Sequence, residues 1–309
     1  MTADASALEN PTSVAVTVQA HTLASTGGAR IAVRDYRAPA VEPRGAVVVA
    51  CAMGVPQDFY APLAQWLARQ GWRVHTFDYR GSGDSLPNTR HGGLCGFKAD
   101  LLDWTHDYEA VVDHAHQANA HQPVHLLGHS LGAQLPGLMG NGHKVSGLLG
   151  VATGSGYWRE NAPQLKHSAL FLWFFLVPVF TRLFGYFPGK RLGAVGDLPT
   201  GVIRQWRRWC LNPRYSVGAE GEAARQSYAR VQFPVLALAM SDDEMMTAQG
   251  LESLMALYTQ APRRVLRLTP AEVSVRRLGH FGAFRGEHQA VLWPRIHQFL
   301  SNLPQAVHV

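Results

Sequence analysis

Residues 123–132, Pro-Val-His-Leu-Leu-Gly-His-Ser-Leu-Gly, constrain the fold of this chain more than any other stretch. A short apolar run leads into Gly-His-Ser-Leu-Gly, and a helix-forming stretch at 131–139 follows at once. Strand, sharp turn and helix in this order are typical of a nucleophile elbow, where a serine stands on a strained turn with its oxygen exposed. The flanking glycines fit because side chains at those positions would clash. A glycine-rich turn without a catalytic role gives the same pattern. The assignment therefore depends on whether the chain also supplies an acid and a histidine as partners of the serine.

The composition indicates a chain with a sizeable core. Of its 309 residues 47% are apolar and 16% are charged, so disorder is expected only near the termini, including residues 1–11. Those first residues have no basic start and no apolar run, so we do not expect a secretory signal. Cys51, Cys95 and Cys210 are widely spaced and lack metal-ligand spacing, which indicates reduced thiols and a cytoplasmic protein.

The net charge of +6 is concentrated in one internal segment. Residues 155–230 contain eleven Lys or Arg and four Asp or Glu, a surplus of seven, which leaves the rest of the chain at about minus one. Because the basic residues are confined to one segment, the charge does not indicate that the whole protein binds nucleic acid.

Apolar runs alternate with helical patterns along most of the chain, which predicts an α/β fold with a mostly parallel central sheet and helices on both faces. The first two runs, separated by Gly27-Gly28, indicate an antiparallel N-terminal hairpin. We expect strands at 12–20, 30–36, 45–53, 72–79, 123–129, 145–153, 233–240 and 264–268. We expect helices at 58–70, 98–120, 131–139, 247–258 and 286–300.

This alternation stops after residue 156, where aromatic and basic clusters replace any convincing strand. Residues 155–230 are therefore interpreted as an inserted helical cap or lid. Residues 12–154 and 231–309 would form the core domain.

Two later loops supply partners for Ser130. A serine hydroxyl is a poor nucleophile at neutral pH, so it needs a base and a third group that orients the base. On such a sheet the chain order is serine, acid, histidine, with the last two in loops at the carboxyl ends of later strands. Ser-Asp-Asp-Glu follows the strand ending at Met240, and Gly-His-Phe-Gly follows the strand ending near Leu268. The pattern predicts a triad of Ser130, Asp243 and His280.

Alternatives remain open for both partners. Asp242 and Glu244 flank the preferred acid, and one of them could cap the helix that begins near Thr247. His288 and His297 are alternative bases on the final helix.

The reaction also needs N–H donors for the oxyanion that develops on the substrate. Leu131, directly after the serine, is one expected donor. Val55 is the other, because Gly54 lets the backbone approach and Pro56 has no N–H.

These motifs together resemble the α/β-hydrolase superfamily: Gly-His-Ser-Leu-Gly at 128–132, Phe-Asp-Tyr-Arg-Gly-Ser-Gly-Asp-Ser at 77–85, the Asp243 loop and Gly-His-Phe-Gly at 279–282. More narrowly, segments 52–57, 156–158, 197–199 and 282–285 are similar to a little-characterised group of bacterial predicted hydrolases. That group is near the serine aminopeptidase and monoacylglycerol-lipase-like branch. The resemblance implies an α/β-hydrolase fold and a Ser-His-Asp hydrolase with neither cofactor nor metal, and it supplies no substrate.

One position departs from the family pattern. Met53-Gly54 stands where His-Gly is usual, and the full form resembles the His-Gly-x-Pro of epoxide hydrolases. Those enzymes need an aspartate nucleophile where this chain has Ser130, so epoxide opening is disfavoured.

Aromatic residues of the cap are the candidate substrate-binding group: Tyr157, Trp158, Phe171, Trp173 and Phe174. The run 169–180 is expected to be too short to span a bilayer and to be interrupted by Pro178 and Arg182. Three compatible interpretations remain: cap helices that bury aromatics, a lid around a lipophilic acyl chain, or a segment touching the membrane surface. Arg204, Arg207 and Arg208 would help the last, although a solvated helix face is the favoured explanation of these arginines.

The sequence therefore predicts a cytoplasmic serine hydrolase, with a peripheral membrane location left open, that acts on a small ester with an apolar acyl group. Amide or peptide hydrolysis, as in aminopeptidases, is the alternative within enzymes. A non-catalytic protein that binds an apolar ligand is the alternative from another class. The oligomeric state is not predicted.

Overall fold

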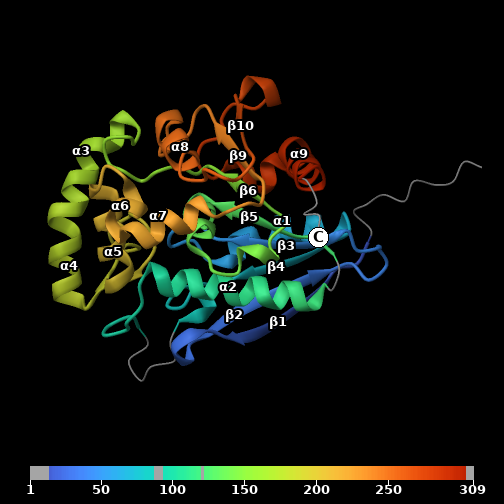
Figure 1. The fold of residues 1–309 in the computed structure, drawn as a ribbon, viewed down its shortest axis with the longest axis horizontal. Helices are drawn as coiled ribbons and strands as arrows, with labels where there is room; N and C mark the ends of the chain where they lie inside the picture. Colours follow the sequence, from blue (N-terminus) through green and yellow to red (C-terminus); the bar gives the residue numbers. More distant parts are fainter. Residues whose placement is uncertain (1–13, 87–92, 120–121, 304–309) are drawn as a thin grey trace, which may run out of the picture.

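The computed structural model describes residues 14–86, 93–119 and 122–303 and has a central sheet flanked by helices (Figure 1). The expected disorder of residues 1–11 lies outside the described residues. Within them, an eight-stranded sheet has the order β1-β2-β4-β3-β5-β6-β9-β10. The strands are β1 Thr17–Ala24, β2 Arg30–Arg37, β3 Gly45–Ala50, β4 Trp72–Phe77, β5 Val124–His129, β6 Gly147–Val151, β9 Val235–Met240 and β10 Arg263–Leu268.

Strand directions confirm the predicted fold class. β1 pairs with β2, and β2 with β4, in antiparallel fashion. The other neighbours, from β4 through β3, β5, β6 and β9 to β10, are parallel. Every residue of β3 and β5 is buried, as expected of central strands covered on both faces. The carboxyl ends of β5, β9 and β10 therefore point to the same edge of the sheet.

Helices cover both faces of the sheet, and alternate residues of β4 show which helix lies on which side. Phe77 of β4 packs against Tyr108 of α2, with ring centroids 5.4 Å apart. Trp72 faces the opposite way and donates from Nε1 to His297 of α9 at 3.0 Å. Outside the segment between β6 and β9, the helices are α1 Ala61–Arg69, α2 Leu101–Ala118, α8 Ala248–Met255 and α9 Gln289–Ser301.

The loop after β4 is fixed to α2 by a buried ion pair. Arg80, 6% exposed, forms hydrogen bonds through Nε and Nη2 to Asp107, which is fully buried. Its Nη1 also reaches Asp103 at 3.0 Å. This part of the 77–85 motif therefore holds α2 against the sheet.

Residues 155–230, between β6 and β9, are mainly helical and gather at the left side of Figure 1. They contain α3 Pro163–Phe171, a π-helical turn Leu172–Leu176, α4 Val177–Phe184, α5 Thr200–Leu211, α6 Tyr215–Glu220 and α7 Glu222–Ala229. The expectation of no strand here is wrong in one place, because β7 Tyr186–Phe187 pairs with β8 Leu198–Pro199. Two-residue strands are too short to produce an alternating pattern.

The expected interruption at Pro178 is also wrong. Helix 163–184 is continuous for 22 residues and is, among the described residues, the one helix long and apolar enough to cross a membrane. The π-helical turn at 172–176 directly precedes α4, in which Pro178 is the second residue. A wider turn accommodates the proline ring and the missing N–H without ending the helix.

Candidate active site

Ser130 stands on a strained turn at the end of β5. Its φ is +53°, a left-handed conformation that non-glycine residues rarely adopt and that is found at functional turns. A Cβ on Gly128 would lie 2.5 Å from the amide nitrogen of Ala133, and one on Gly132 would overlap the carbonyl of Ala50. The two glycines are therefore required by close backbone approach, as the sequence predicted. Ser130 itself is 9% exposed.

The helix expected at 131–139 is instead two short 3-10 helices, Ser130–Ala133 and Leu135–Leu138. Pro136 lacks the N–H that a continuous α-helix needs, and Gly137 follows it. Gln134 between the two helices accepts a hydrogen bond from Tyr215 at 2.8 Å and donates to Gly154 at 2.8 Å. The residues after the serine are thus held by the segment 155–230 as well as by the sheet.

Asp243 and His280 meet in a buried pair. His280 Nδ1 lies 2.9 Å from Asp243 Oδ2 and 3.1 Å from Oδ1, and the two side chains are 3% and 2% exposed. Asp243 Oδ1 also accepts from the backbone N–H of Met245 and Met246, at 2.8 and 2.9 Å. A carboxylate fixed in this way orients the imidazole, keeps Nδ1 protonated and leaves the Nε2 lone pair available as a base.

The neighbouring acids have other contacts. Asp242 accepts from the backbone N–H of Leu278 and Gly279, at 2.8 and 3.1 Å. Glu244 accepts from the backbone N–H of His280 at 3.1 Å. Both therefore shape the loop that carries His280, while Thr247 caps α8 through its own side chain. Of the three acids, Asp243 is the one that contacts the imidazole.

The alternative bases lie in different surroundings. His297 accepts from Trp72 Nε1 at 3.0 Å, on the face of the sheet covered by α9. His288 is paired at 3.7 Å with Glu287, at the start of α9. By contrast, the backbone carbonyl of His280 lies 3.1 Å from Nε2 of His129, the residue before Ser130.

His129, the residue before Ser130, connects the elbow to the His280 loop. Its Nε2 lies 3.1 Å from the carbonyl oxygen of His280, which can only accept, so Nε2 carries the proton and Nδ1 does not. Nδ1 then accepts from Tyr60 Oη at 2.8 Å. Burial, together with the nearby His280, lowers the pKa of His129 well below its usual value, and the ring stays neutral.

The loop after β3 is joined to the same chain of hydrogen bonds. Tyr60 Oη accepts from the backbone N–H of Ala52 at 2.9 Å. Val55 N–H donates to the carbonyl of Ala52 at 3.1 Å, so it is engaged within its own turn. This contact argues against Val55 as an oxyanion donor. The turn hydrogen bond from Val55 to Ala52 leaves no pattern in the sequence that would predict it. In contrast, the backbone N–H of Met53 has no hydrogen-bond partner among the described residues.

Leu131 remains a candidate donor. It is the second residue of a 3-10 helix, and N–H groups in the first turn of a helix have no intrahelical partner. β3 and β5 are parallel neighbours with Ala50 opposite Gly128, so the residues directly after each strand, Met53 and Leu131 included, leave the same edge of the sheet.

Known proteins are similar to this chain in part of its sequence or in its fold. A family model described as serine aminopeptidase matches residues 41–183. A monoacylglycerol lipase from Mycolicibacterium smegmatis is 34% identical over 119 residues, which are 38% of this chain and 40% of that enzyme. A soluble variant of monoglyceride lipase from Saccharomyces cerevisiae, solved with a substrate analogue, superposes with a TM-score of 0.64 at 16% identity, covering 96% of this chain and 98% of that one. A carboxyl esterase from Bacillus coagulans gives 0.63 at 13% identity, covering 93% and 99%.

The protein has the α/β-hydrolase fold. The predicted resemblance to this superfamily, in its monoacylglycerol-lipase-like branch, is thereby confirmed. The aligned part spans well under half of the M. smegmatis enzyme.

In this α/β-hydrolase fold the five predicted substrate-binding residues occupy different environments. Trp173 is 3% exposed and packs against Trp206 of α5, with ring centroids 5.1 Å apart. Phe171 and Phe174, on the same helix, are 55% and 60% exposed. Trp173 is closed off by helix packing, while Phe171 and Phe174 face outward. A role of these residues in substrate binding stays a prediction.

Tyr157 and Trp158 are half-buried neighbours near the start of the segment 155–230, with rings 6.4 Å apart. Trp158 N–H donates to the carbonyl of Cys210 at 2.9 Å, and the Arg159 guanidinium lies 5.1 Å from the Trp158 ring centroid. Separately, a cavity of about 400 Å³ lies beside the acid and includes Thr153, Ala162, Met240, Asp243 and Met246 in its lining. Its wall joins the β6 and β9 ends to the first residues of helix 163–184.

Proposed function

We propose that this α/β hydrolase is a serine hydrolase that cleaves carboxylic esters with an apolar acyl group. The observation that carries the proposal is the buried Asp243–His280 pair, 2.9 Å between Oδ2 and Nδ1. It lies on loops after β9 and β10, while Ser130 stands in a left-handed conformation after β5. This is the set of roles that a nucleophile, its base and the orienting acid require.

In the first half of the reaction, His280 Nε2 takes the proton of Ser130 Oγ as the oxygen bonds to the ester carbon. The carbonyl electron pair moves onto oxygen, and the tetrahedral intermediate collapses with cleavage of the bond to the alcohol. The leaving alkoxide takes the proton from His280, and an acyl group remains on Ser130. Water, deprotonated by His280, then attacks the acyl carbon in the same manner, releasing the acid and restoring Ser130.

For the oxyanion we propose the N–H groups of Leu131 and Met53. Met53 replaces Val55 in this role, because Val55 N–H already donates to Ala52. Two preorganised N–H donors stabilise charge that exists only in the transition state, so they accelerate the chemical step.

An apolar acyl group is supported by sequence similarity to a monoacylglycerol lipase and by the apolar helix 163–184. Amide or peptide cleavage is the second candidate, favoured by the match to a serine aminopeptidase model. Ester and amide hydrolysis use the same nucleophile and base, so a substrate panel must separate them.

We also propose that helix 163–184 rests on an anionic membrane surface, with the protein otherwise in the cytoplasm. One stripe of the helix, Trp173, Val177 and Thr181, is buried, and Trp173 and Thr181 contact α5. Its other face exposes apolar side chains, namely Phe171, Phe174, Phe175 and Leu183. An apolar face flanked by cations is the pattern of a helix lying in a membrane interface.

The cations lie beside this face. A cavity of about 620 Å³ between α4 and α5 is lined by four arginines, Arg182, Arg204, Arg207 and Arg208. Vesicle flotation with phosphatidylglycerol should recover the protein, and phosphatidylcholine alone should recover much less. The double variant Phe171→Ser, Phe175→Ser should lose the binding. Val265→Ser, which changes an exposed valine on β10, is the matched control; equal binding by all three proteins would refute this part.

The function is tested by hydrolysis of p-nitrophenyl esters of increasing acyl length and of aminoacyl p-nitroanilides. We expect ester cleavage that rises with acyl length and is abolished in Ser130→Ala and His280→Ala. Ser301→Ala, at the exposed end of α9, should retain full activity. Anilide cleavage without ester cleavage would favour the second candidate, and no cleavage of either would support a binding protein.

A further inference from the structure

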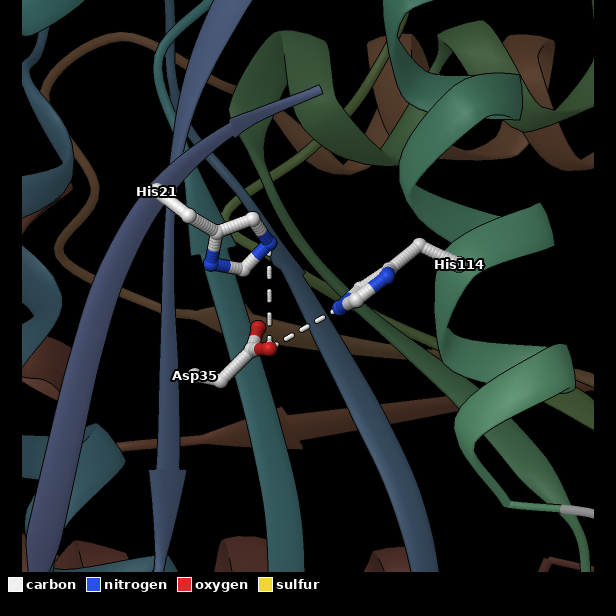
Figure 2. A group of neighbouring side chains, drawn as sticks. All are labelled: His21, Asp35 and His114. Atoms are coloured by element: carbon white, nitrogen blue, oxygen red, sulfur yellow. Dashed lines mark hydrogen bonds and ion pairs between the residues drawn. The ribbon is translucent and has the colours of Figure 1, made fainter. Parts of the chain in front are cut away.

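The side chains of His21, Asp35 and His114 converge on one point at the N-terminal edge of the sheet (Figure 2). His21 on β1 pairs with Val33 of β2, and Asp35 lies two residues further along β2, so both side chains project from the same face. His114 reaches the same point from α2, which covers that face. Between β2 and the elbow strand β5 lie β4 and β3, so the group is separate from the proposed triad.

The potential ligand atoms of these residues lie within 4.8 Å of one another. His114 Nε2 is 2.8 Å and His21 Nε2 is 3.8 Å from the same carboxylate oxygen, Asp35 Oδ2. Ligand atoms around a tetrahedral zinc ion are about 3.3 Å apart, given metal–ligand bonds of about 2.0 Å. The two observed separations bracket that value, so small side-chain shifts would bring these two pairs of atoms to tetrahedral spacing.

A second observation concerns nitrogen atoms that the protein leaves unsatisfied. Both ring nitrogens of His21 and Nε2 of His75 are buried without a hydrogen-bond partner in the described part of the chain. Buried polar atoms are nearly always satisfied, and an exception calls for a ligand, an ion or water. A neutral imidazole nitrogen with a free lone pair is the commonest metal ligand in proteins.

His75 of β4 supplies a hydrogen bond that orients the carboxylate of Asp35. It lies opposite Asp35 in the sheet, and its Nδ1 donates to Asp35 Oδ1 at 2.7 Å. This bond fixes the carboxylate and leaves Oδ2 directed toward His21 and His114. Hydrogen bonds to ligating carboxylates are a regular feature of metal sites.

We propose that His21, Asp35 and His114 bind a zinc ion that joins the N-terminal hairpin to α2. Two imidazoles and one carboxylate match the ligand preferences of Zn²⁺, with the fourth position taken by water. Because the ligands come from β1, β2 and α2, the ion would stabilise the association of the N-terminal hairpin with a helix distant from it in the sequence. This inference is independent of the proposed hydrolase activity.

The test is zinc binding to the full chain after dialysis against EDTA, measured by isothermal titration calorimetry and by metal analysis after gel filtration. We expect one Zn²⁺ per chain, a dissociation constant in the micromolar range or below, and a higher Tm in the presence of zinc. Cobalt(II) should give the visible absorption of a tetrahedral complex. Failure of the wild-type protein to bind zinc would overturn the proposal.

Variants separate this site from other histidines. His21→Ala and His114→Ala should each abolish binding and the Tm increase, and His75→Gln should weaken binding by about 10-fold to 100-fold. His106→Ala, an exposed histidine on the same helix, and His280→Ala should bind as the wild type does. His21 is on the edge strand β1, so we expect His21→Ala to fold even if His114→Ala does not. Zinc affinity retained in His21→Ala would contradict the proposal. Near-ultraviolet circular dichroism checks the fold of each variant.

Discussion

Tyr60 Oη donates a hydrogen bond to His129 Nδ1 across 2.8 Å, and through it the loop after β3 is tied to the residue before Ser130. Because His129 Nε2 donates to the His280 carbonyl at 3.1 Å, one neutral imidazole connects three loops. The loops after β3, β5 and β10 therefore share a buried polar chain, and such chains rigidify a site only when every member is satisfied.

Tyr60→Phe should reduce kcat more than it changes KM. Removing the hydroxyl leaves His129 Nδ1 and Ala52 N–H buried without partners, which costs about 1–3 kcal/mol in the free energy of unfolding. A small displacement of the elbow should lower kcat by about 10-fold to 100-fold. Tyr186→Phe, on β7, is the matched control. Steady-state kinetics and urea unfolding would check this; a loss of stability with unchanged kcat would show a purely structural role.

Asp243→Asn should lower kcat by about 10⁴-fold, because the amide no longer stabilises the protonated imidazole or its tautomer. Asp242→Asn and Glu244→Gln are its natural controls, since both side chains accept from backbone N–H groups of the His280 loop. Glu244 is also paired with Arg277 at 3.3 Å. We expect them to lose stability and a much smaller part of kcat. A severe loss confined to Asp242→Asn would reassign the acid.

Stability should fall between pH 6.5 and pH 4 because of His125. Burial lowers the pKa of His125 to about 4, while in the unfolded chain it is about 6.5. Below pH 6.5 the unfolded state binds a proton that the folded state does not, so the free energy of unfolding decreases, by about 3 kcal/mol once pH 4 is reached. His129 adds to the same trend. Urea titrations should show a shallower pH dependence in His125→Gln; an identical slope would rule out this cause.

Arg80→Met should destabilise the fold by about 3–5 kcal/mol, because it leaves the carboxylate of Asp107 buried without its cation. Arg225→Met, which removes an exposed pair with Glu222, should have little effect. Thermal unfolding of both variants provides the measurement, and equal Tm values would contradict this view of the 77–85 motif.

Much of the site could be predicted from the sequence because the direction of parallel strands determines at which edge of the sheet their following loops lie. The parallel strands β5, β9 and β10 are followed by Ser130, by the Asp243 loop and by the His280 loop. Parallel strands end at the same edge of a sheet, so these residues lie at one edge. The motif order does not distinguish the three adjacent acids, whereas the contact of Asp243 with the imidazole and the backbone contacts of Asp242 and Glu244 do.

The remainder depends on tertiary contacts that leave no local pattern. The turn bond from Val55 to Ala52 and the packing of Trp173 on Trp206 arise from backbone geometry and a neighbouring helix. The group of His21, Asp35 and His114 depends on strand register and on a helix far along the chain, so neither the residue spacing nor the family resemblance indicates it.

The central claim is tested most directly by treating the protein with a fluorophosphonate and locating the adduct by peptide mass spectrometry. The account predicts one adduct, on Ser130, that is lost in Ser130→Ala and strongly slowed in His280→Ala. No adduct on the folded wild-type protein, or an adduct on another serine, would contradict it.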